Sequence, residues 1–277
     1  MVMGGSPPED GEFRIGPYRV VRHVAQGGMG AVYQVEEPST GQHYALKLAA
    51  NRRQDEERFD RIHRALAAID HPGIMRSHRC GTTPDGRRFM LFGFVSGTPA
   101  QVFAKSMGTP GTVDRTAAVV TVAIHLGEAL DHLHGRGIIH RDVKSANVLV
   151  RADRSACLID FDSAVLPGLP IEQGRFVGTY SYAPPEQLQG HPIDARSDVY
   201  AMGVLLFRML SGVRPFDGET HHDVIHHHLH TPPPALDRMV RGLPPRVVEL
   251  VEAMLQKRPS DRPQSAAEVV DRLRKAH

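Results

Sequence analysis

The stretch HRDVKSAN, residues 140–147, decides how the fold and chemistry of this chain are interpreted. It places a carboxylate (Asp142), an ammonium group (Lys144) and a side-chain amide (Asn147) on one short segment that follows an apolar helical pattern. The carboxylate can accept a proton or orient a hydroxyl group, the ammonium group can neutralise negative charge, and the amide oxygen suits a hard cation such as Mg²⁺. The alternative is a polar turn after a helix, with His140 satisfied in the core.

A second acidic segment, CLIDFDSAV, covers residues 157–165. Asp160 ends its apolar strand pattern, eighteen positions after Asp142, and is a candidate second ligand for the cation that Asn147 would bind. It could equally cap the turn that follows, because Asp often accepts hydrogen bonds from nearby backbone N–H groups. Asp162 stands two positions later and raises the local negative charge.

Two segments near the N-terminus are suited to phosphate groups. In VAQGGMGAV, residues 24–32, three closely spaced glycines would let backbone N–H groups approach phosphate oxygens without obstruction by a Cβ atom. The strand-like YALK ends at Lys47, whose ammonium group could bind phosphates as a point charge or extend to water. Most glycine-rich turns have no role in phosphate binding. This loop therefore indicates a phosphate site only in combination with Lys47 and the later motifs.

Composition excludes several classes of protein. The chain has 277 residues, 41% hydrophobic and 23% charged, which is enough for one large domain or two small lobes with real cores. A net charge of +2 with scattered basic residues gives no case for nucleic acid as a partner. No apolar run reaches the roughly 18 residues of a membrane span. The two distant cysteines, Cys80 and Cys157, argue against a disulfide scaffold and favour the cytoplasm.

The chain divides by pattern into three regions. Residues 1–15 are small, polar and rich in Pro and Gly, which predicts a mobile tail. Residues 16–95 are strand-like, with a helical piece over 56–69 and a hairpin signal, TPDGR, at 83–87. Residues 96–277 are mostly helical by apolar periodicity. The expected helices within them cover 114–134, 198–212, 246–257 and 265–277. The predicted fold class is α+β, a small β-rich lobe before a larger helical lobe, with a ligand cleft between them.

Taken in order, these motifs resemble those of the protein-kinase family, in its bacterial Ser/Thr branch. Further pieces that carry the resemblance are GTYSYAPPEQ at 178–187, DARSDVYAMG at 194–203 and PSDRP around Arg262. The resemblance covers about residues 18–273 and implies a two-lobed protein kinase fold, with an N-lobe over 16–95 and a C-lobe over 96–277 around ATP. It also implies transfer of the γ-phosphoryl group of ATP to Ser or Thr hydroxyls of a protein substrate, with Mg²⁺ or possibly Mn²⁺.

The resemblance assigns roles residue by residue. Asp142 would be the catalytic base with Lys144 beside it, and Asn147 and Asp160 would hold the metal. Glu186 and Arg262 would form a structural ion pair, and Asp198 would brace the catalytic loop. Phe92 would be the gatekeeper, and Val32, Ala45 and Leu149 would sandwich the adenine. The full nucleotide-binding set would be Val24, Ala25, Gln26, Gly27, Gly28, Met29, Gly30, Ala31, Val32, Ala45, Lys47, Phe92, Gly93, Phe94, Val95 and Leu149.

Three positions depart from the family pattern. Ala25 replaces the first glycine of the phosphate loop, a mild change. Ile62 stands where the family has the helix Glu that pairs with the strand Lys. Asp162 stands where the family has a glycine after Asp-Phe, and Asp would reach such backbone angles only with strain. We hypothesise that the last two changes compensate, with the carboxylate of Asp162 reaching Lys47.

Two alternative functions stay open at this point. A pseudokinase or scaffold, which keeps the fold but transfers little phosphate, is favoured by Ile62 and Asp162. A small-molecule phosphotransferase is disfavoured by the intact GTYSYAPPE and SDVYAMG pieces. The oligomeric state and the protein substrate are not indicated by the sequence.

Two other segments are unusual. The activation segment has no Ser or Thr between Ala164 and Val177, so Glu172 could supply a fixed negative charge to Arg141, or packing alone could order the loop. The histidine-rich run THHDVIHHHLH, residues 220–230, is typical of a surface helix. Its His222 and His226 lie one helical turn apart and could bind zinc, although no third ligand is evident, or the run could sense pH.

Overall fold

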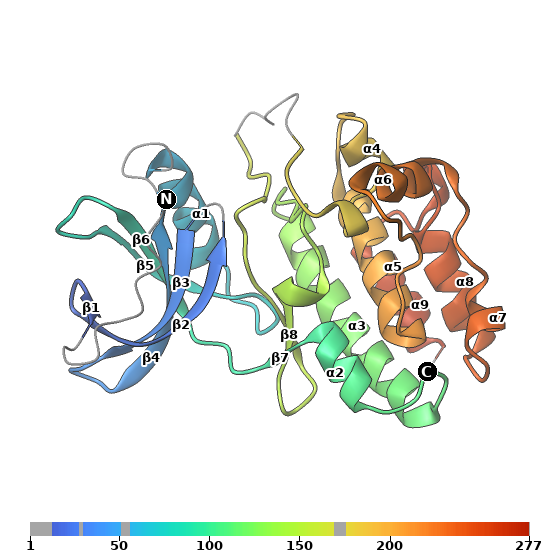
Figure 1. The fold of residues 1–277 in the computed structure, drawn as a ribbon, viewed down its shortest axis with the longest axis horizontal. Helices are drawn as coiled ribbons and strands as arrows, with labels where there is room; N and C mark the ends of the chain where they lie inside the picture. The colour runs from blue at the N-terminus through green and yellow to red at the C-terminus, as the bar shows by residue number, and fades with distance from the viewer. Residues whose placement is uncertain (1–12, 28–29, 51–55, 169–175, 277) are drawn as a thin grey trace. The chain divides into compact units, whose positions relative to one another are not determined.

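A computed structural model describes residues 13–27, 30–50, 56–168 and 176–276 of the chain. It separates into two compact units, each labelled by element in Figure 1. The first unit comprises Met1–Asp70 and Met75–Val95, and the second comprises His71–Ile74 and Ser96–His277. The first unit is β-rich and the second is mostly helical, as the α+β prediction requires.

The first unit is built on a six-stranded antiparallel sheet in the order β1-β2-β3-β4-β6-β5. The hairpin predicted at TPDGR joins β5 to β6, which pair antiparallel. One helix, α1 (Glu56–Ala67), lies against β5 and β6 and ends two residues earlier than predicted. The strands are β1 (Arg14–Ile15), β2 (Tyr18–Gly27), β3 (Gly30–Glu37), β4 (Gln42–Ala49), β5 (Ser77–Thr82) and β6 (Arg88–Gly93).

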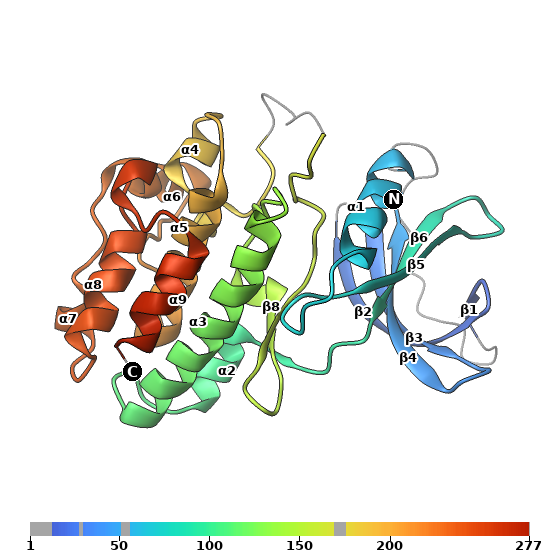
Figure 2. The ribbon, with the colours of Figure 1, turned by 180° about the vertical axis from the view of Figure 1, so that it is seen from behind.

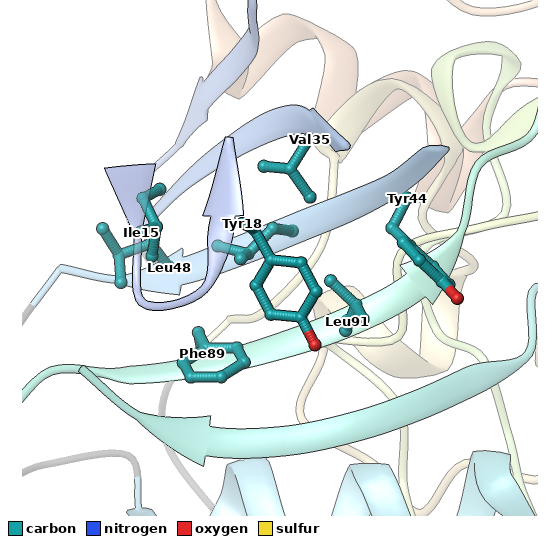
Figure 3. Close-up of a cluster of buried hydrophobic side chains, with 8 residues drawn as sticks. Ile15, Tyr18, Val35, Tyr44, Leu48, Phe89 and Leu91 are labelled. Carbon is teal, nitrogen blue, oxygen red and sulfur yellow. The ribbon is translucent and has the colours of Figure 1, made fainter. Parts of the chain in front are cut away.

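A cluster of buried side chains covers one part of this sheet (Figure 3). Tyr18 lies at its centre, with its ring edge-on to Tyr44 and Phe89 at centroid distances of 6.3 and 6.2 Å. Ile15 of β1 is buried in the same cluster. The prediction of a mobile tail over residues 1–15 is therefore wrong for Arg14–Ile15, since pairing with β2 and apolar burial hold them in place. Residues 1–12 lie outside the described part of the chain.

The second unit is organised around long helices. They are α3 (Val113–His134), α5 (Ala195–Ser211), α8 (Pro245–Met254) and α9 (Ala266–Arg274). Figure 2 shows α3 and α9 lying side by side. Gly127 permits this close approach, because a Cβ atom there would lie 2.6 Å from a methyl group of Val270. Nearly every residue of α5 is buried, as its continuous apolar pattern predicts for a helix inside the larger lobe.

Shorter elements carry the segments that matter for function. A three-stranded sheet, β7-β8-β9, holds the end of HRDVKSAN next to CLIDFDSAV. These elements are β7 (Thr98–Pro99), α2 (Ala100–Ser106), η1 (Ser145–Asn147), β8 (Val148–Val150), β9 (Ala156–Leu158), η2 (Tyr180–Tyr182), α4 (Pro185–Leu188), α6 (His221–His230), α7 (Leu236–Met239) and η3 (Pro259–Asp261). Over the described ranges, none of the helices has the length and apolarity needed to cross a bilayer.

Helix ends in the second unit follow local capping signals in the sequence. Asp194 accepts a hydrogen bond from the backbone N–H of Arg196 at the start of α5, and Gly212 ends that helix in the left-handed conformation with φ 88°. Thr220 and Asp223 form a reciprocal capping box at the start of α6. These caps fix where the buried helices begin and end, and therefore where the loops between them emerge.

Candidate active site

The side chains of HRDVKSAN converge on the carboxylate of Asp142. Lys144 Nζ donates to Asp142 Oδ2 at 2.6 Å, and Asn147 Nδ2 donates to the same oxygen at 3.0 Å. Thr179, 37 positions further along the chain, donates its hydroxyl to Asp142 Oδ1 at 2.8 Å and accepts from Lys144 Nζ at 2.9 Å. Both carboxylate oxygens are therefore held by named donors, and the group is fixed in orientation and nearly buried.

Asp198, at the start of α5, holds the backbone just before Asp142. Its Oδ2 accepts from the backbone N–H of His140 at 2.8 Å, and its Oδ1 accepts from that of Arg141 at 2.9 Å. Arg141 has φ 66°, a left-handed conformation that costs a non-glycine residue about 1–2 kcal/mol. The two charge-assisted bonds from Asp198 offset that cost, so this carboxylate positions the catalytic loop as the sequence predicted.

His134, the last residue of α3, completes this brace. Its Nε2 lies 2.8 Å from Asp198 Oδ2. Full burial alone would raise the pKa of Asp198, but the hydrogen bond and charge of His134, with His140, hold that pKa below its ordinary value. Asp198 thus stays ionised and keeps accepting the two backbone N–H bonds.

Asn147 and Asp160 are joined through the backbone of the β7-β8-β9 sheet. The N–H of Ile159 donates to the carbonyl oxygen of Asn147 at 2.9 Å, which brings the residue before Asp160 against Asn147. The amide nitrogen of Asn147 is used by Asp142, so its side-chain oxygen is the atom that would bind a cation. One carboxylate and one amide oxygen fit Mg²⁺, which keeps several water or phosphate ligands and rarely needs a full protein cage.

The backbone of DFD differs from the sequence prediction. Asp160 has φ 62°, whereas Asp162 is absent from the described non-glycine residues with positive φ. The prediction of backbone strain at Asp162 is therefore wrong, because the residue of this turn with a left-handed conformation is Asp160. The ring of His140 packs edge-on against Phe161 at 4.9 Å, and its Nε2 lies 3.2 Å from the Ile159 carbonyl oxygen. These contacts fix the turn from the catalytic-loop side.

In the first unit, strand register brings several of the predicted nucleotide-binding residues together. Val32 on β3 pairs with Lys47 on β4, and Ala45 on β4 pairs with Phe92 on β6. Lys47 is only 8% exposed. Its register partners on the neighbouring strands are the apolar residues Val32 and Met90.

The glycine-rich loop lies between β2 and β3. Ala25 pairs with Val32, Gln26 with Ala31, and Gly27 with Gly30. Gly30 has φ 148°, and a Cβ atom there would lie 2.0 Å from the carbonyl oxygen of Leu48, so only glycine fits. Gly28 and Met29, at the tip of the loop, lie outside the described residues.

The remaining predicted nucleotide-binding residues lie at strand ends. Val24 on β2 is 44% exposed. Gly93 ends β6 and is followed by Phe94 and Val95, all three half-buried. In the second unit, Leu149 on β8 is half-buried and pairs with Cys157 of β9.

Comparison with known sequences accounts for this arrangement. The family described as "Protein kinase domain" matches residues 18–272, which is most of the chain. The chain belongs to the protein kinase family. Its fold class and its resemblance to bacterial kinases, both predicted from the motifs, are thereby confirmed.

Curated bacterial proteins are similar to this kinase domain over nearly its whole length. Serine/threonine-protein kinase pkn2 of Myxococcus xanthus is 36% identical over 276 residues, which cover 95% of this chain and 32% of the relative. DNA damage-responsive serine/threonine-protein kinase RqkA of Deinococcus radiodurans is 32% identical, over 94% of this chain and 40% of the relative. Serine/threonine-protein kinase PknA of Mycobacterium tuberculosis is 33% identical, over 95% and 62%. The chain thus spans less than two thirds of each relative.

In helix α1 of this kinase domain, Ile62 occupies the position at which the family has a Glu that pairs with the strand Lys. Ile62 is 2% exposed and shares its buried face with Phe59 and Leu66. The acids of the helix are used elsewhere: Asp60 bonds to Arg88 of β6 and accepts from the Cys80 thiol, and Glu57 pairs with Arg61. Asp60 therefore faces away from the position of Ile62. Glu56 lies at the helix start, and its side chain is outside the described residues.

The ion pair predicted to stabilise the larger lobe is present. Arg262 donates from Nη1 to Glu186 Oε1 at 2.8 Å and from Nη2 to Oε2 at 2.9 Å, and both side chains are buried. Ser197 donates to the same Oε1, and the guanidinium group lies over the ring of Tyr200 at 4.7 Å. The pair joins the segment after Thr179 to α5 and to the segment before α9.

Sequence reasoning missed two residues that hold the loops around Asp142 and Thr179. Gln187 donates from Nε2 to the carbonyl oxygens of Val177 at 2.7 Å and Arg141 at 3.3 Å, joining the activation segment to the catalytic loop. Gly178, with φ 127°, leaves the space that this amide occupies, since a Cβ there would lie 2.8 Å from it. His134 is the second missed residue. Neither carries a sequence signal, because both act through partners far along the chain.

The histidine-rich helix α6 does not form a metal centre. Within the described ranges, no cluster of three or more His, Cys, Asp or Glu side chains could hold a metal ion. His222 and His226 are exposed, whereas His228 is buried, with Nδ1 3.0 Å from the Tyr200 hydroxyl. Burial, together with the positive charge of Lys257, lowers the pKa of His228 to about 3. Glu172, the predicted partner of Arg141, lies outside the described residues.

Proposed function

We propose that the chain is an ATP-dependent Ser/Thr protein kinase domain. The observation that carries this proposal is the carboxylate of Asp142, held by Lys144, Asn147 and Thr179 in one network. The relatives named Ser/Thr protein kinases support the acceptor class, because similarity to them extends over more than nine tenths of this chain.

Asp142 would act on the acceptor hydroxyl group. In the described network its Oδ1 accepts one hydrogen bond, from Thr179, and a carboxylate oxygen has a second acceptor position. A substrate Ser or Thr hydroxyl bound there would be oriented and would lose its proton to Asp142 as the oxygen is phosphorylated. Lys144 lies against the other oxygen, so its charge is available to the transferred phosphoryl group as well as to Asp142.

The nucleotide would be held by the first unit through Lys47 and the backbone of the glycine-rich loop. Asn147 and Asp160 would hold Mg²⁺, or Mn²⁺ in its place. A bound divalent cation neutralises phosphate charge and orients the transferred group. The remaining contribution of the protein is alignment, which the hydrogen bonds to Asp142 and Asp198 supply.

The proposed substrate is a protein, and the proposed compartment is the cytoplasm. Thr179 supports a protein acceptor because its hydroxyl joins the segment after the activation loop directly to the catalytic carboxylate. The cytoplasm supplies ATP, and the free thiols of Cys80 and Cys157 are compatible with its reducing conditions.

Phosphate transfer from labelled ATP, in the presence of Mg²⁺ or Mn²⁺, tests the proposal. Replacing Asp142 by Asn should lower the rate by about 10²–10⁴-fold, because the amide cannot accept the hydroxyl proton. Asp153→Asn, in the exposed turn between β8 and β9, is the matched control and should retain the wild-type rate. Equal incorporation by wild type and Asp142→Asn would exclude the proposed role of Asp142.

A pseudokinase that binds nucleotide but transfers little phosphate is the second candidate. The buried Ile62 favours it, since the family carboxylate at this position is replaced by an apolar side chain. The hypothesis that Asp162 compensates for Ile62 stays a prediction. Under that hypothesis Asp162→Gly should lose phosphate transfer, whereas a gain of activity would mean that Asp162 restrains the enzyme. Nucleotide binding without transfer in the wild type would establish the pseudokinase.

A further inference from the structure

A pocket of about 310 Å³ opens in the second unit beside the catalytic loop. Its walls come from the end of β7, from α2, from Lys144 and η1, from Tyr182 and from α5. The residues that matter for its chemistry are Gln101, Val102, Lys105, Lys144, Tyr182 and Arg208. We call it the cation pocket, because three of these residues carry positive charge.

The described lining of the cation pocket includes no carboxylate. Lys144 is paired with Asp142, which leaves the charges of Lys105 and Arg208 to define the pocket. Arg208 donates from Nη1 to the Tyr182 hydroxyl at 2.7 Å. This neutral partner positions the guanidinium group without compensating its positive charge. Lys105 is exposed at the end of α2. The pocket therefore has the electrostatic character of an anion site.

Gln101 gives a second and independent indication of a ligand. It is 5% exposed, and in the described structure neither Oε1 nor Nε2 has a hydrogen-bond partner. Buried polar side chains are nearly always bonded, and leaving one without a partner costs about 1–3 kcal/mol. Its backbone N–H donates to Ser145 Oγ at 2.8 Å, so its backbone is held against the catalytic loop. A polar ligand in the pocket would satisfy this amide.

The pocket lies next to the phosphate acceptor position. Lys144 lines the pocket and also reaches Asp142 Oδ2 at 2.6 Å, so the two sites share one side chain. An extended peptide advances about 3.3 Å per residue. A substrate whose hydroxyl is at Asp142 would therefore place the side chain of a residue about two or three positions away in the pocket.

We propose that the cation pocket binds an anionic side chain, a carboxylate or a phosphate, of the protein substrate close to its acceptor residue. This inference rests on the proposed kinase function and adds the class of substrate to it. Arg208 and Lys105 bind the anion, the amide of Gln101 donates to it, and the apolar wall at Val102 packs against the methylene groups of a Glu side chain.

A positional scan of Ser peptides tests the inference. Each peptide carries one Glu, Gln or phosphoserine at a defined distance from the acceptor, and kcat/KM is measured for each. We expect Glu to exceed Gln by about tenfold at one position, two or three residues away, because charge-assisted hydrogen bonds are the strongest ordinary ones. Phosphoserine above Glu at that position identifies phosphate as the natural anion, and the reverse identifies the carboxylate. The preference should decline at high salt.

Charge reversal at the pocket provides the decisive variant. Lys105→Glu, on an exposed helix end, should reduce the Glu-to-Gln ratio to about one, whereas Lys275→Glu, exposed at the end of α9, should leave it at about ten. Gln101→Leu should lower the ratio while Gln101→Glu should reverse it. Because each result is a ratio within one protein, loss of folded material does not alter it.

Binding without catalysis separates this inference from the proposed function. If no peptide is phosphorylated by the wild type, the kinase proposal fails, and fluorescence anisotropy of the labelled Glu and Gln peptides still tests the pocket. Tighter binding of the Glu peptide, lost in Lys105→Glu, supports the pocket. Phosphorylation of Glu and Gln peptides at equal rates, or equal affinity for both, overturns the inference and leaves the kinase function standing.

Discussion

The two units can be compared by their charged pairs, of which the second unit has buried examples as well as exposed ones such as Arg196–Asp194. In the second unit, Glu186 and Arg262 have side chains 7% and 0% exposed, and Asp198 and His134 are comparably buried. In the first unit, the pair Arg19–Glu36 and the pairs of α1 keep at least one side chain substantially exposed. The core of the first unit is instead aromatic and aliphatic around Tyr18.

The difference reflects which parts of each unit must be held in a fixed position. The second unit must maintain a strained backbone at Arg141 and an oriented carboxylate at Asp142, which only directional bonds can do. The first unit must present a sheet with a glycine-rich turn, and apolar packing is sufficient for that. Four experiments test whether buried charge and apolar packing stabilise the two units in these different ways.

The first experiment removes the buried charge of Glu186. Glu186→Gln leaves Arg262 buried without an anion, so the free energy of unfolding should fall by about 3–5 kcal/mol. Glu36→Gln is the same substitution at a more exposed pair of the first unit and should cost about 1 kcal/mol or less. Urea denaturation of both variants measures the difference. Equal losses would remove the distinction between the units.

The second experiment tests whether Ile62 stabilises the first unit by packing alone. Ile62→Ala should lower the free energy of unfolding by about 2–5 kcal/mol, because it leaves a cavity beside Phe59 and Leu66. Ile62→Val removes one methylene and should cost about 0.5–1.5 kcal/mol. If the two variants were equally stable, Ile62 would not be a close-packed core residue.

The third experiment uses pH to detect a buried neutral base in the second unit. His228 has a folded pKa of about 3 and an unfolded pKa of about 6.5, so between these values only the unfolded chain binds its proton. Stability is therefore lost as pH falls below about 6.5, by about 1.4 kcal/mol per pH unit from this residue. The groups that face it are Lys257, whose Nζ lies 2.8 Å from the His228 carbonyl oxygen, together with His227 and Tyr200.

His228→Asn should flatten the pH dependence of the unfolding midpoint by that amount, since the amide keeps a partner for Tyr200 but does not titrate. His226→Asn, on the exposed side of the same helix, is the matched control and should retain the wild-type slope. A wild-type slope in His228→Asn would show that His228 is not buried in neutral form. Other histidines contribute equally to both curves and cancel in the comparison.

The smallest expected effect concerns the hydroxyl of Thr179. Thr179→Val keeps the shape of the side chain but removes the bonds to Asp142 and Lys144, so kcat should fall by about tenfold with little change in stability. Thr179→Ser restores the hydroxyl and should recover most of the rate. If Val and Ser behaved alike, the hydroxyl would have no part in orienting Asp142.

Much of this protein could be predicted from local sequence. The order of strands and helices follows from apolar periodicity, the helix ends from caps such as Asp194 and Gly212, and the hairpin of β5 and β6 from its turn residues. Asp142, Lys144 and Asn147 lie within one short segment, so their chemical roles could be predicted from the sequence alone. The family assignment followed from the order of such segments.

Other features depended on contacts between distant positions. His134 and Gln187 carry no local signal, yet they bond to Asp198 and to the activation segment. The backbone of DFD was predicted with its unusual residue at Asp162, but packing of His140 and Phe161 accompanies the left-handed conformation at Asp160 instead. His228 has the same local sequence character as its exposed neighbours on α6, and it is buried because it packs against Tyr200.

The fold class, the catalytic segment and the kinase family are evident in the sequence, because periodicity, turn chemistry and short motifs act within a few residues of the chain. Which charges are buried together, which backbone positions are strained and where a pocket lies beside Lys144 depend on how distant segments pack. The physical reason is that burial and hydrogen bonding depend on partners tens of positions apart, as Thr179 and Asp142 are. The positive wall of the cation pocket is assembled from Lys105 of α2, Lys144 of the catalytic loop and Arg208 of α5, and it exists only once these segments pack together.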